Sequence, residues 1–246
     1  MEGIVNELIK YFLQESSHPI IDIPNNYVNK REFLRGLINV REINEVPKEI
    51  IEKESELLKL ELKEKNILDI SNTKARLSVY QGDITNVRCD AIVNLSHSKL
   101  MGCMKPNHNC VSNKIHTYAG ISLKLKIKEI TKGKDIDVGK VILTEGYNLP
   151  CKYIIHTPKP TVEDCLSKKL ENEIVDMYIN SLELAKKNKI KTLCVPNLSV
   201  SSNIKEEVAR ITVNTIKKYL QDNNEIEKVL INTYTLEDSN IYNDLL

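Results

Sequence analysis

Glycine is scarce in this chain of 246 residues, and the last of its eight glycines is Gly146. Residues 147–246 therefore lack the one residue type that adopts positive φ and allows close backbone approach without strain. Glycine-rich loops that cradle phosphate groups depend on both properties. A phosphate-binding loop in the C-terminal part of this chain would have to be built differently.

Aromatic residues are also few, since ten Tyr, two Phe and no Trp make up 5% of the chain, so a core must consist mainly of Ile, Leu and Val. The 35 basic and 34 acidic residues nearly cancel to a net charge of +1, which gives no electrostatic footprint for nucleic acid. No apolar run approaches the roughly 20 residues that span a bilayer. Residues 1–7 carry acids where a signal peptide carries a basic region. We expect a cytoplasmic protein with no membrane or nucleic-acid partner.

Six cysteines are present, and in the cytoplasm they are expected to be reduced thiols or metal ligands rather than disulfides. Two of them, Cys103 and Cys110, lie within eight residues of one another with His108 between them. Zinc prefers thiolate sulfur and imidazole nitrogen, and three protein ligands with an open fourth position are typical of a catalytic site. The alternative is that the cysteines are small apolar residues that fall near a histidine by coincidence.

Hydrophobic periodicity predicts only helices up to about residue 70, and no strand signal interrupts them. The first helix has apolar positions from Ile4 to Leu13, and the others cover residues 27–40 and 48–65. Breaks are predicted at His18–Pro19 and over residues 23–26. This region reads as a helical appendage that packs on its neighbour.

From about Arg76 short apolar runs alternate with long amphipathic segments, which is typical of an α/β domain. The predicted strands cover residues 77–80, 91–95, 141–144, 153–156, 192–195 and 228–233. The predicted helices comprise about twenty residues from Val111, residues 168–188, residues 205–222 and a short helix from Leu236.

Several motifs resemble those of a known family. Gly82-Asp83-Ile84-Thr85, followed by Asp90-Ala91-Ile92-Val93-Asn94, is similar to the opening of a macrodomain. The cysteine loop, the segment Tyr147-Asn148-Leu149-Pro150 and the helical extension with Arg31, Arg35 and Asn39 resemble the zinc-containing branch of that family. The resemblance implies a three-layer α/β/α macrodomain with a mixed sheet over residues 73–246, preceded by a helical extension over residues 1–72.

The resemblance also implies a function. The branch comprises hydrolases that remove ADP-ribose from proteins and that are encoded beside a sirtuin-like ADP-ribosyltransferase. By this likeness Cys103, His108 and Cys110 would hold a catalytic Zn²⁺, which acts as a Lewis acid on what occupies its open position. The expected partners are ADP-ribose, ADP-ribosylated protein and a sirtuin-like transferase system.

Roles for three further residues follow from the same likeness. Asp83 would accept hydrogen bonds from the adenine amino group, with the backbone of Ile84 beside it, and Asn94 would support the distal ribose. Each residue also has a purely structural interpretation. Asp83 could cap its own turn, and Asn94 could be a buried amide with satisfied hydrogen bonds.

Two departures from the family pattern bear on function. Where the family has a second asparagine after Asn94, this chain has His97, which could bind a ribose hydroxyl, become a fourth zinc ligand or face solvent. The second departure lies in the loop where the family carries Ser-Thr-Gly-Val-Phe-Gly-Phe-Pro around the diphosphate. The corresponding substrate-binding residues here are Asn197, Leu198, Ser199, Val200, Ser201 and Ser202, followed by Asn203 and Ile204.

Serine costs on the order of 1 kcal/mol or more where glycine would adopt a left-handed conformation. We therefore expect a loop of different shape and weaker diphosphate binding, although serine hydroxyl groups can also donate hydrogen bonds. Three functions remain open at this point. The first is a zinc-dependent protein ADP-ribosyl hydrolase, favoured by the intact ligand spacing. The others are a reader that binds ADP-ribose without hydrolysing it, favoured by the altered loop, and a protein that keeps zinc only for structure.

Overall fold

The computed structural model describes residues 1–16, 22–162 and 165–246. The N-terminal region forms three helices, as the hydrophobic periodicity predicts. These are α1 (Glu2–Ser16), α2 (Tyr27–Val40) and α3 (Lys48–Glu64). The predicted break over residues 23–26 is confirmed, because the Asn26 side chain accepts a hydrogen bond from Asn29 N and caps α2. The break predicted at His18–Pro19 lies outside the described residues.

A mixed sheet forms the centre of the molecule, with strand order β2-β7-β6-β3-β5-β4. All neighbouring pairs along this path are parallel except β4 and β5, which are antiparallel. The strands are β2 (Leu77–Gln81), β3 (Val87–Ser96), β4 (Ile142–Glu145), β5 (Cys151–Pro158), β6 (Thr192–Pro196) and β7 (Lys228–Thr233). Each of these strands was predicted within a few residues.

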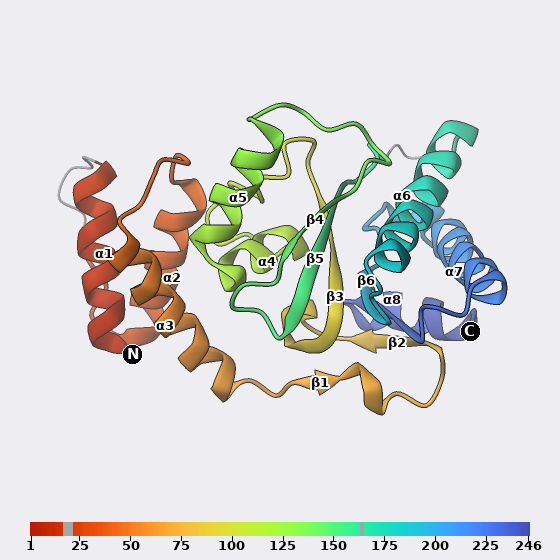
Figure 1. Cartoon of the computed structure of the whole chain (residues 1–246), viewed down its shortest axis with the longest axis horizontal. Helices are drawn as coiled ribbons and strands as arrows, with labels where there is room; N and C mark the ends of the chain where they lie inside the picture. The colour runs from red at the N-terminus through yellow and green to blue at the C-terminus, as the bar shows by residue number, and fades with distance from the viewer. Residues whose placement is uncertain (17–21, 163–164) are drawn as a thin grey trace.

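Helices cover both faces of the sheet (Figure 1). The helices on one face are α4 (Val111–Ala119) and α5 (Ile121–Thr131), and those on the other side are α6 (Lys168–Lys187), α7 (Lys205–Asp222) and α8 (Leu236–Asp244). Successive side chains of β3 point to opposite faces. Ala91 and Val93 therefore lie in the core with α6 and α7, whereas Ile92 lies in the core with α4 and α5. The expected α/β/α layers are confirmed.

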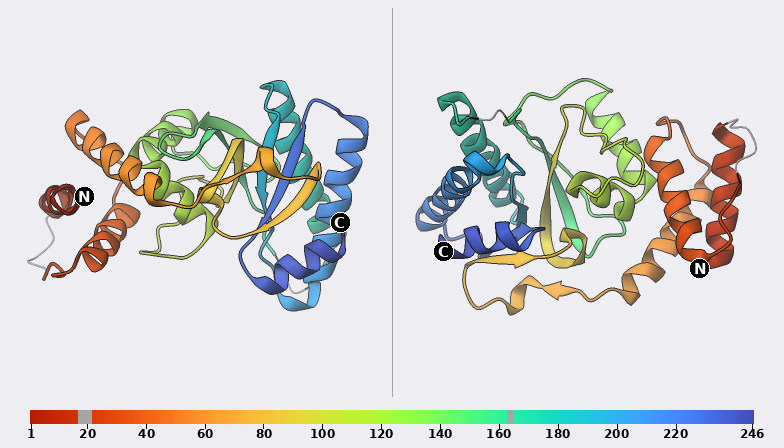
Figure 2. Two further views of the ribbon diagram at one scale, coloured as in Figure 1. Left: turned by 90° about the horizontal axis from the view of Figure 1, so that it is seen from below. Right: turned by 180° about the vertical axis from the view of Figure 1, so that it is seen from behind.

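The helical extension lies beyond α4 and α5, at the opposite end of the molecule from the C-terminal helices (Figure 2). Its helices share one apolar cluster, which includes Leu8, Leu34 and Leu57 and is completed by Ile121 of α5. The carboxylate of Glu54 on α3 accepts a hydrogen bond from Ile121 N at 2.8 Å. The extension is therefore packed on the α/β body. The boundary at residue 72 stays a prediction.

Two details of the secondary structure were predicted wrongly. The helix expected to run from Val111 for some twenty residues is two helices, because Gly120 between them has φ of 95°. The N-terminal region also contains a strand, β1 (Leu68–Asp69), which pairs in parallel with β3. A two-residue strand has no periodicity, so the sequence gives no signal for it. Among the described residues, no helix is both long and apolar enough to span a membrane.

Candidate active site

The sulfur atoms of Cys103 and Cys110 and an imidazole nitrogen of His108 converge after β3. Their possible ligand atoms all lie within 4.8 Å of one another, and Cys103 Sγ is 3.3 Å from His108 Nδ1. All three residues are half-buried. Two thiols and one imidazole form a donor set that suits zinc, and a fourth position remains for a water molecule or substrate. The residues therefore fit the metal that the sequence implies.

The loop that carries these residues has a tightly specified backbone. Leu100, Gly102 and Asn107 adopt positive φ of 58°, 80° and 52°. A Cβ atom at Gly102 would come within 2.8 Å of the His116 ring, so the backbone needs glycine here for both conformation and space. The ring of His116 is buried, and its environment lowers the pKa well below the usual value, chiefly through desolvation. A neutral imidazole therefore supports the start of the loop.

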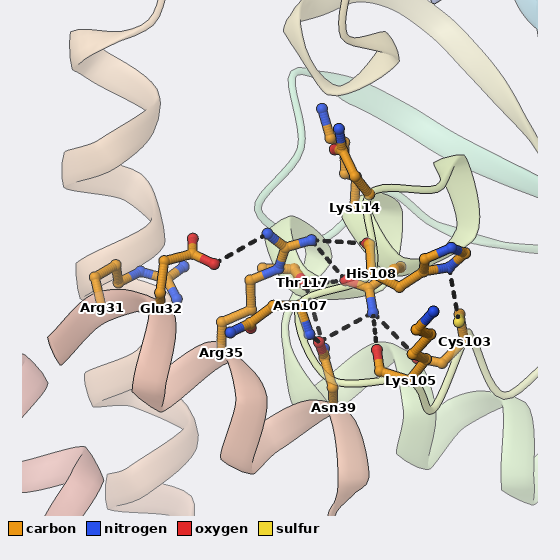
Figure 3. A network of polar contacts seen from close by, with 12 residues as sticks. Arg31, Glu32, Arg35, Asn39, Cys103, Lys105, Asn107, His108, Lys114 and Thr117 are labelled. Atoms are coloured by element: carbon orange, nitrogen blue, oxygen red, sulfur yellow. Dashed lines mark hydrogen bonds and ion pairs between the residues drawn. The ribbon is translucent and has the colours of Figure 1, made fainter. Parts of the chain in front are cut away.

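Side chains from two helices hold the rest of the loop. On α4, the buried Asn113 side chain donates to the carbonyl oxygens of Cys103 and Lys105, each at 3.2 Å. On α2, Arg35 donates to the carbonyl oxygen of His108 at 3.0 Å, and Asn39 accepts from Asn107 N at 3.1 Å. Figure 3 shows how Arg35 and Asn39 reach the loop from the extension. The extension is therefore in direct contact with the candidate metal loop.

A cavity of about 240 Å³ opens on the three donor residues. Helix α4 begins directly after Cys110, and its first residues Val111 and Ser112 line the cavity, so the positive end of the helix dipole lies beside it. The remaining lining residues are Leu95, Ser96, His97, Lys159, Pro196, Asn197, Leu198 and Ser199. Neither Asp nor Glu is among the described residues of this lining. The described part of the wall therefore offers no pair of carboxylates of the kind that an ordinary glycosidase uses.

A second cavity of about 320 Å³ continues from the first. The two have five lining residues in common, which are His108, Cys110, Val111, Asn197 and Ser199. The far end of the second cavity is lined by Asp83, Ile84, Lys114 and Tyr234. The two cavities thus adjoin at the metal loop and together form one cleft.

Asp83 both caps its own turn and lines the cleft. One carboxylate oxygen accepts from the backbone and hydroxyl of Thr85 at 2.9 and 2.7 Å, and the other accepts from Lys114 at 2.9 Å. Burial alone would raise the pKa of Asp83, but the hydrogen bonds from Lys114 and Thr85 outweigh it and lower the pKa. A carboxylate accepts about four hydrogen bonds. Asp83 therefore retains room for one donor from a ligand, and its adenine role stays a prediction.

Tyr234, which follows β7, was not predicted from the sequence as a site residue. Its side chain is 53% exposed and lines the cleft. Lys114 Nζ lies 4.8 Å from the centre of the Tyr234 ring, and Asn109 of the metal loop donates to its hydroxyl at 2.6 Å. An exposed aromatic residue directly after an apolar strand was the available signal. The ring offers a flat face to a ligand at the Asp83 end of the cleft.

Asn94 lies outside the lining of either cavity. It is fully buried, and its Nδ2 lies 3.1 Å from Nδ1 of His156, whose Nε2 lies 2.9 Å from Thr144 Oγ1. Burial lowers the pKa of His156 to about 3, so the ring is neutral. Asn94 Oδ1 has no hydrogen-bond partner. Asn94 is thus part of a buried polar group in which one amide oxygen is unpaired, and its contact with the distal ribose stays a prediction.

His97 is exposed and lines the cleft, but it is not part of the group of three donor residues. Of the altered loop, Asn197, Leu198 and Ser199 line the cleft, whereas Val200, Ser201 and Ser202 are absent from the lining of both cavities. No residue from 197 to 204, all of which the structure describes, has positive φ. The serines are therefore unstrained, and the loop has a conformation that does not need glycine.

The family model described as Macro domain matches residues 93–212. Over 253 residues the chain is 32% identical to a protein-ADP-ribose hydrolase of Staphylococcus aureus, covering 99% of this chain and 94% of that protein. A protein of the same name from Treponema medium is 30% identical over 97% of this chain and 96% of its own length. The Oceanobacillus iheyensis macrodomain with ADP superimposes with a TM-score of 0.60 at 29% identity, covering 68% of this chain and 87% of that chain.

The fold, the cleft and these similarities together define a macrodomain. The chain belongs to the macrodomain family. Its relatives from Staphylococcus aureus and Treponema medium resemble it over nearly the whole length, including the helical extension.

Proposed function

We propose that this protein is a protein-ADP-ribose hydrolase that removes ADP-ribose from modified protein side chains with the help of one Zn²⁺ ion. The observation that carries the proposal is the convergence of Cys103, His108 and Cys110 at a cleft, beside a cavity in which no described lining residue is a carboxylate. Near-full-length similarity to proteins named protein-ADP-ribose hydrolase supports the reaction.

In this reaction the bond between the anomeric carbon of the distal ribose and the protein side chain breaks. The hydroxyl group of a water molecule goes to the ribose carbon, and a proton goes to the leaving side chain. The cleft would orient the nucleotide, with adenine between Asp83 and Tyr234 and the distal ribose beside Cys103, His108 and Cys110. A zinc ion held by these three residues would supply Lewis-acid activation at its open position.

The binding partners follow from the same proposal. The substrate is a protein that carries ADP-ribose, and a sirtuin-like ADP-ribosyltransferase is the enzyme we propose to produce it. Two free thiols as metal ligands also require a reducing compartment, which supports a cytoplasmic location.

The conformation of residues 197–204 favours a second candidate function, a reader that binds ADP-ribose without cleaving it. Release of ADP-ribose from an ADP-ribosylated protein distinguishes the two, when it is measured together with elemental analysis. The hydrolase should release ADP-ribose and carry one zinc per chain. Cys103→Ala and Cys110→Ala should lose both the release of ADP-ribose and the bound zinc. Cys165→Ala changes an exposed cysteine outside the cleft and should keep both properties. A zinc-loaded protein that binds ADP-ribose but releases none would establish the reader.

A further inference from the structure

We infer that Arg35 and Asn39, on the second helix of the extension, are positioning residues of the metal centre. They fix the backbone of residues 103–113 so that the two thiols and the imidazole converge. The inference rests on the proposed zinc site and adds that the extension is a structural part of that site.

Asn39 joins the loop to helix α4 through a single oxygen atom. Its side chain is 2% exposed, and Oδ1 accepts both from Asn107 N at 3.1 Å and from Asn113 Nδ2 at 3.0 Å. Asn107 directly precedes His108 and has φ of 52°, a conformation that non-glycine residues seldom adopt. The hydrogen bond that Asn107 N donates to Asn39 therefore stabilises a turn, and this turn sets the direction of the His108 imidazole.

Arg35 binds the loop on the carbonyl side of His108. Its Nη2 atom donates to the carbonyl oxygen of His108 at 3.0 Å and to Asn113 Oδ1 at 2.8 Å. The Arg35 side chain is 12% exposed, so both bonds form largely away from water. Hydrogen bonds from a charged donor are stronger than neutral ones.

Asn113 connects these contacts to the first ligand. With Oδ1 held by Arg35, its Nδ2 faces Asn39 and the carbonyl oxygens of Cys103 and Lys105. The backbone of Cys103 and that of His108 thus belong to one buried polar network whose two remote members come from the extension. Residues that orient metal ligands are typically worth 10- to 100-fold in metal affinity.

Attachment of the extension does not depend on this network. The helices dock through the apolar cluster that includes Ile121, through the bond from Ile121 N to Glu54, and through the bonds from Lys124 to the carbonyl oxygens of Ile38 and Asn39. Removal of the Arg35 or Asn39 side-chain groups should therefore leave the extension in place and loosen the loop.

The test measures zinc affinity by competition with a chromophoric chelator, and the thiolate-to-metal absorption band of the Co²⁺-substituted protein. Asn39→Leu and Arg35→Met should weaken zinc binding about 10- to 100-fold and alter the Co²⁺ band. Asn39→Asp keeps the acceptor oxygen and should retain both properties within about threefold, a change of less than 1 kcal/mol. Arg41→Met is the matched control, because Arg41 also belongs to the extension but binds Glu15 and not the loop.

The outcomes separate this inference from the proposed function. A natural protein that binds neither zinc nor Co²⁺ would overturn the metal centre itself. Natural affinity and an unchanged Co²⁺ band in Asn39→Leu and Arg35→Met would overturn only the positioning role. An equal loss in Arg41→Met would also overturn it, because the effect would then come from a weakened extension.

Discussion

The hydroxyl oxygen of Tyr234 accepts a hydrogen bond from Nδ2 of Asn109 at 2.6 Å, and Asn109 lies between His108 and Cys110 in the sequence. This bond ties an exposed aromatic ring at one end of the cleft to the candidate metal loop. The bond fixes the position of the ring beside the loop, and Asn109 and Tyr234 line the same cavity.

Tyr234→Ala should weaken binding of ADP-ribose by about 1–3 kcal/mol, the usual value of one base stacked on an aromatic side chain. Tyr234→Phe keeps the ring and loses only the bond from Asn109, so most of the affinity should remain. Isothermal titration calorimetry with ADP-ribose measures both variants. If Tyr234→Ala binds as tightly as the natural protein, adenine does not stack on this ring.

Ser199→Gly and Ser202→Gly, combined with Ser201→Phe, should tighten binding of ADP-ribose and leave the zinc content unchanged. The reason is that the present loop has no residue with positive φ, whereas backbone amides that wrap a diphosphate commonly require it. Each hydrogen bond from a backbone amide to a phosphate is worth roughly 1.5–3 kcal/mol. Two regained bonds should therefore increase the affinity for ADP-ribose by more than about a hundredfold.

Calorimetry on the triple variant and elemental analysis provide the test. Low micromolar affinity of the natural protein, unchanged by the three substitutions, would contradict this expectation. The serines would then bind the diphosphate through another geometry.

Glu54→Gln should change how stability depends on pH. Burial raises the pKa of Glu54 from 4.5 to about 7 in the folded protein, although the bond from Ile121 N and the charge of Arg31 oppose the rise. Between these two values the folded state binds more protons than the unfolded state. The free energy of unfolding contributed by this group therefore falls as pH rises from about 4.5 to about 7 and stays constant above.

Glutamine does not ionise, so the Glu54→Gln variant does not lose this free energy of unfolding as pH rises. Its free energy of unfolding minus that of the natural protein should therefore increase by up to about 3 kcal/mol between pH 4.5 and pH 8. Urea unfolding of both proteins across that range gives the difference. A difference that does not vary with pH would show that Glu54 has the same pKa in the folded and unfolded states.

Removal of residues 1–72 should give an unstable or aggregating protein. The deletion exposes Ile121, which is 2% exposed in the full chain, and removes the carbonyl oxygens of Ile38 and Asn39 that bind the buried Lys124. Size-exclusion chromatography and thermal melting of the fragment provide the measurement. A monomeric fragment with the melting temperature of the full chain would refute this role of the extension.

The sequence by itself determined the elements of the fold, because their hydrophobic patterns are local. The alternation of buried strands with long amphipathic helices predicted every strand of the main sheet path and nearly every helix. It also placed Cys103, His108 and Cys110 close together, since a separation of a few residues limits the distance between them. The single helix predicted over α4 and α5 failed at Gly120, because the sequence does not show whether a glycine will use its freedom to adopt positive φ.

The tertiary structure decided which distant side chains complete the site. Arg35 and His108 are 73 positions apart in the chain, and Asn109 and Tyr234 are 125 positions apart. The hydrophobic periodicity of the sequence does not predict such contacts, because they depend on how α2 packs on α4 and on where β7 lies in the sheet. The same holds for the orientation of the Asn94 amide toward His156, which was set by the packing of β5 against β3.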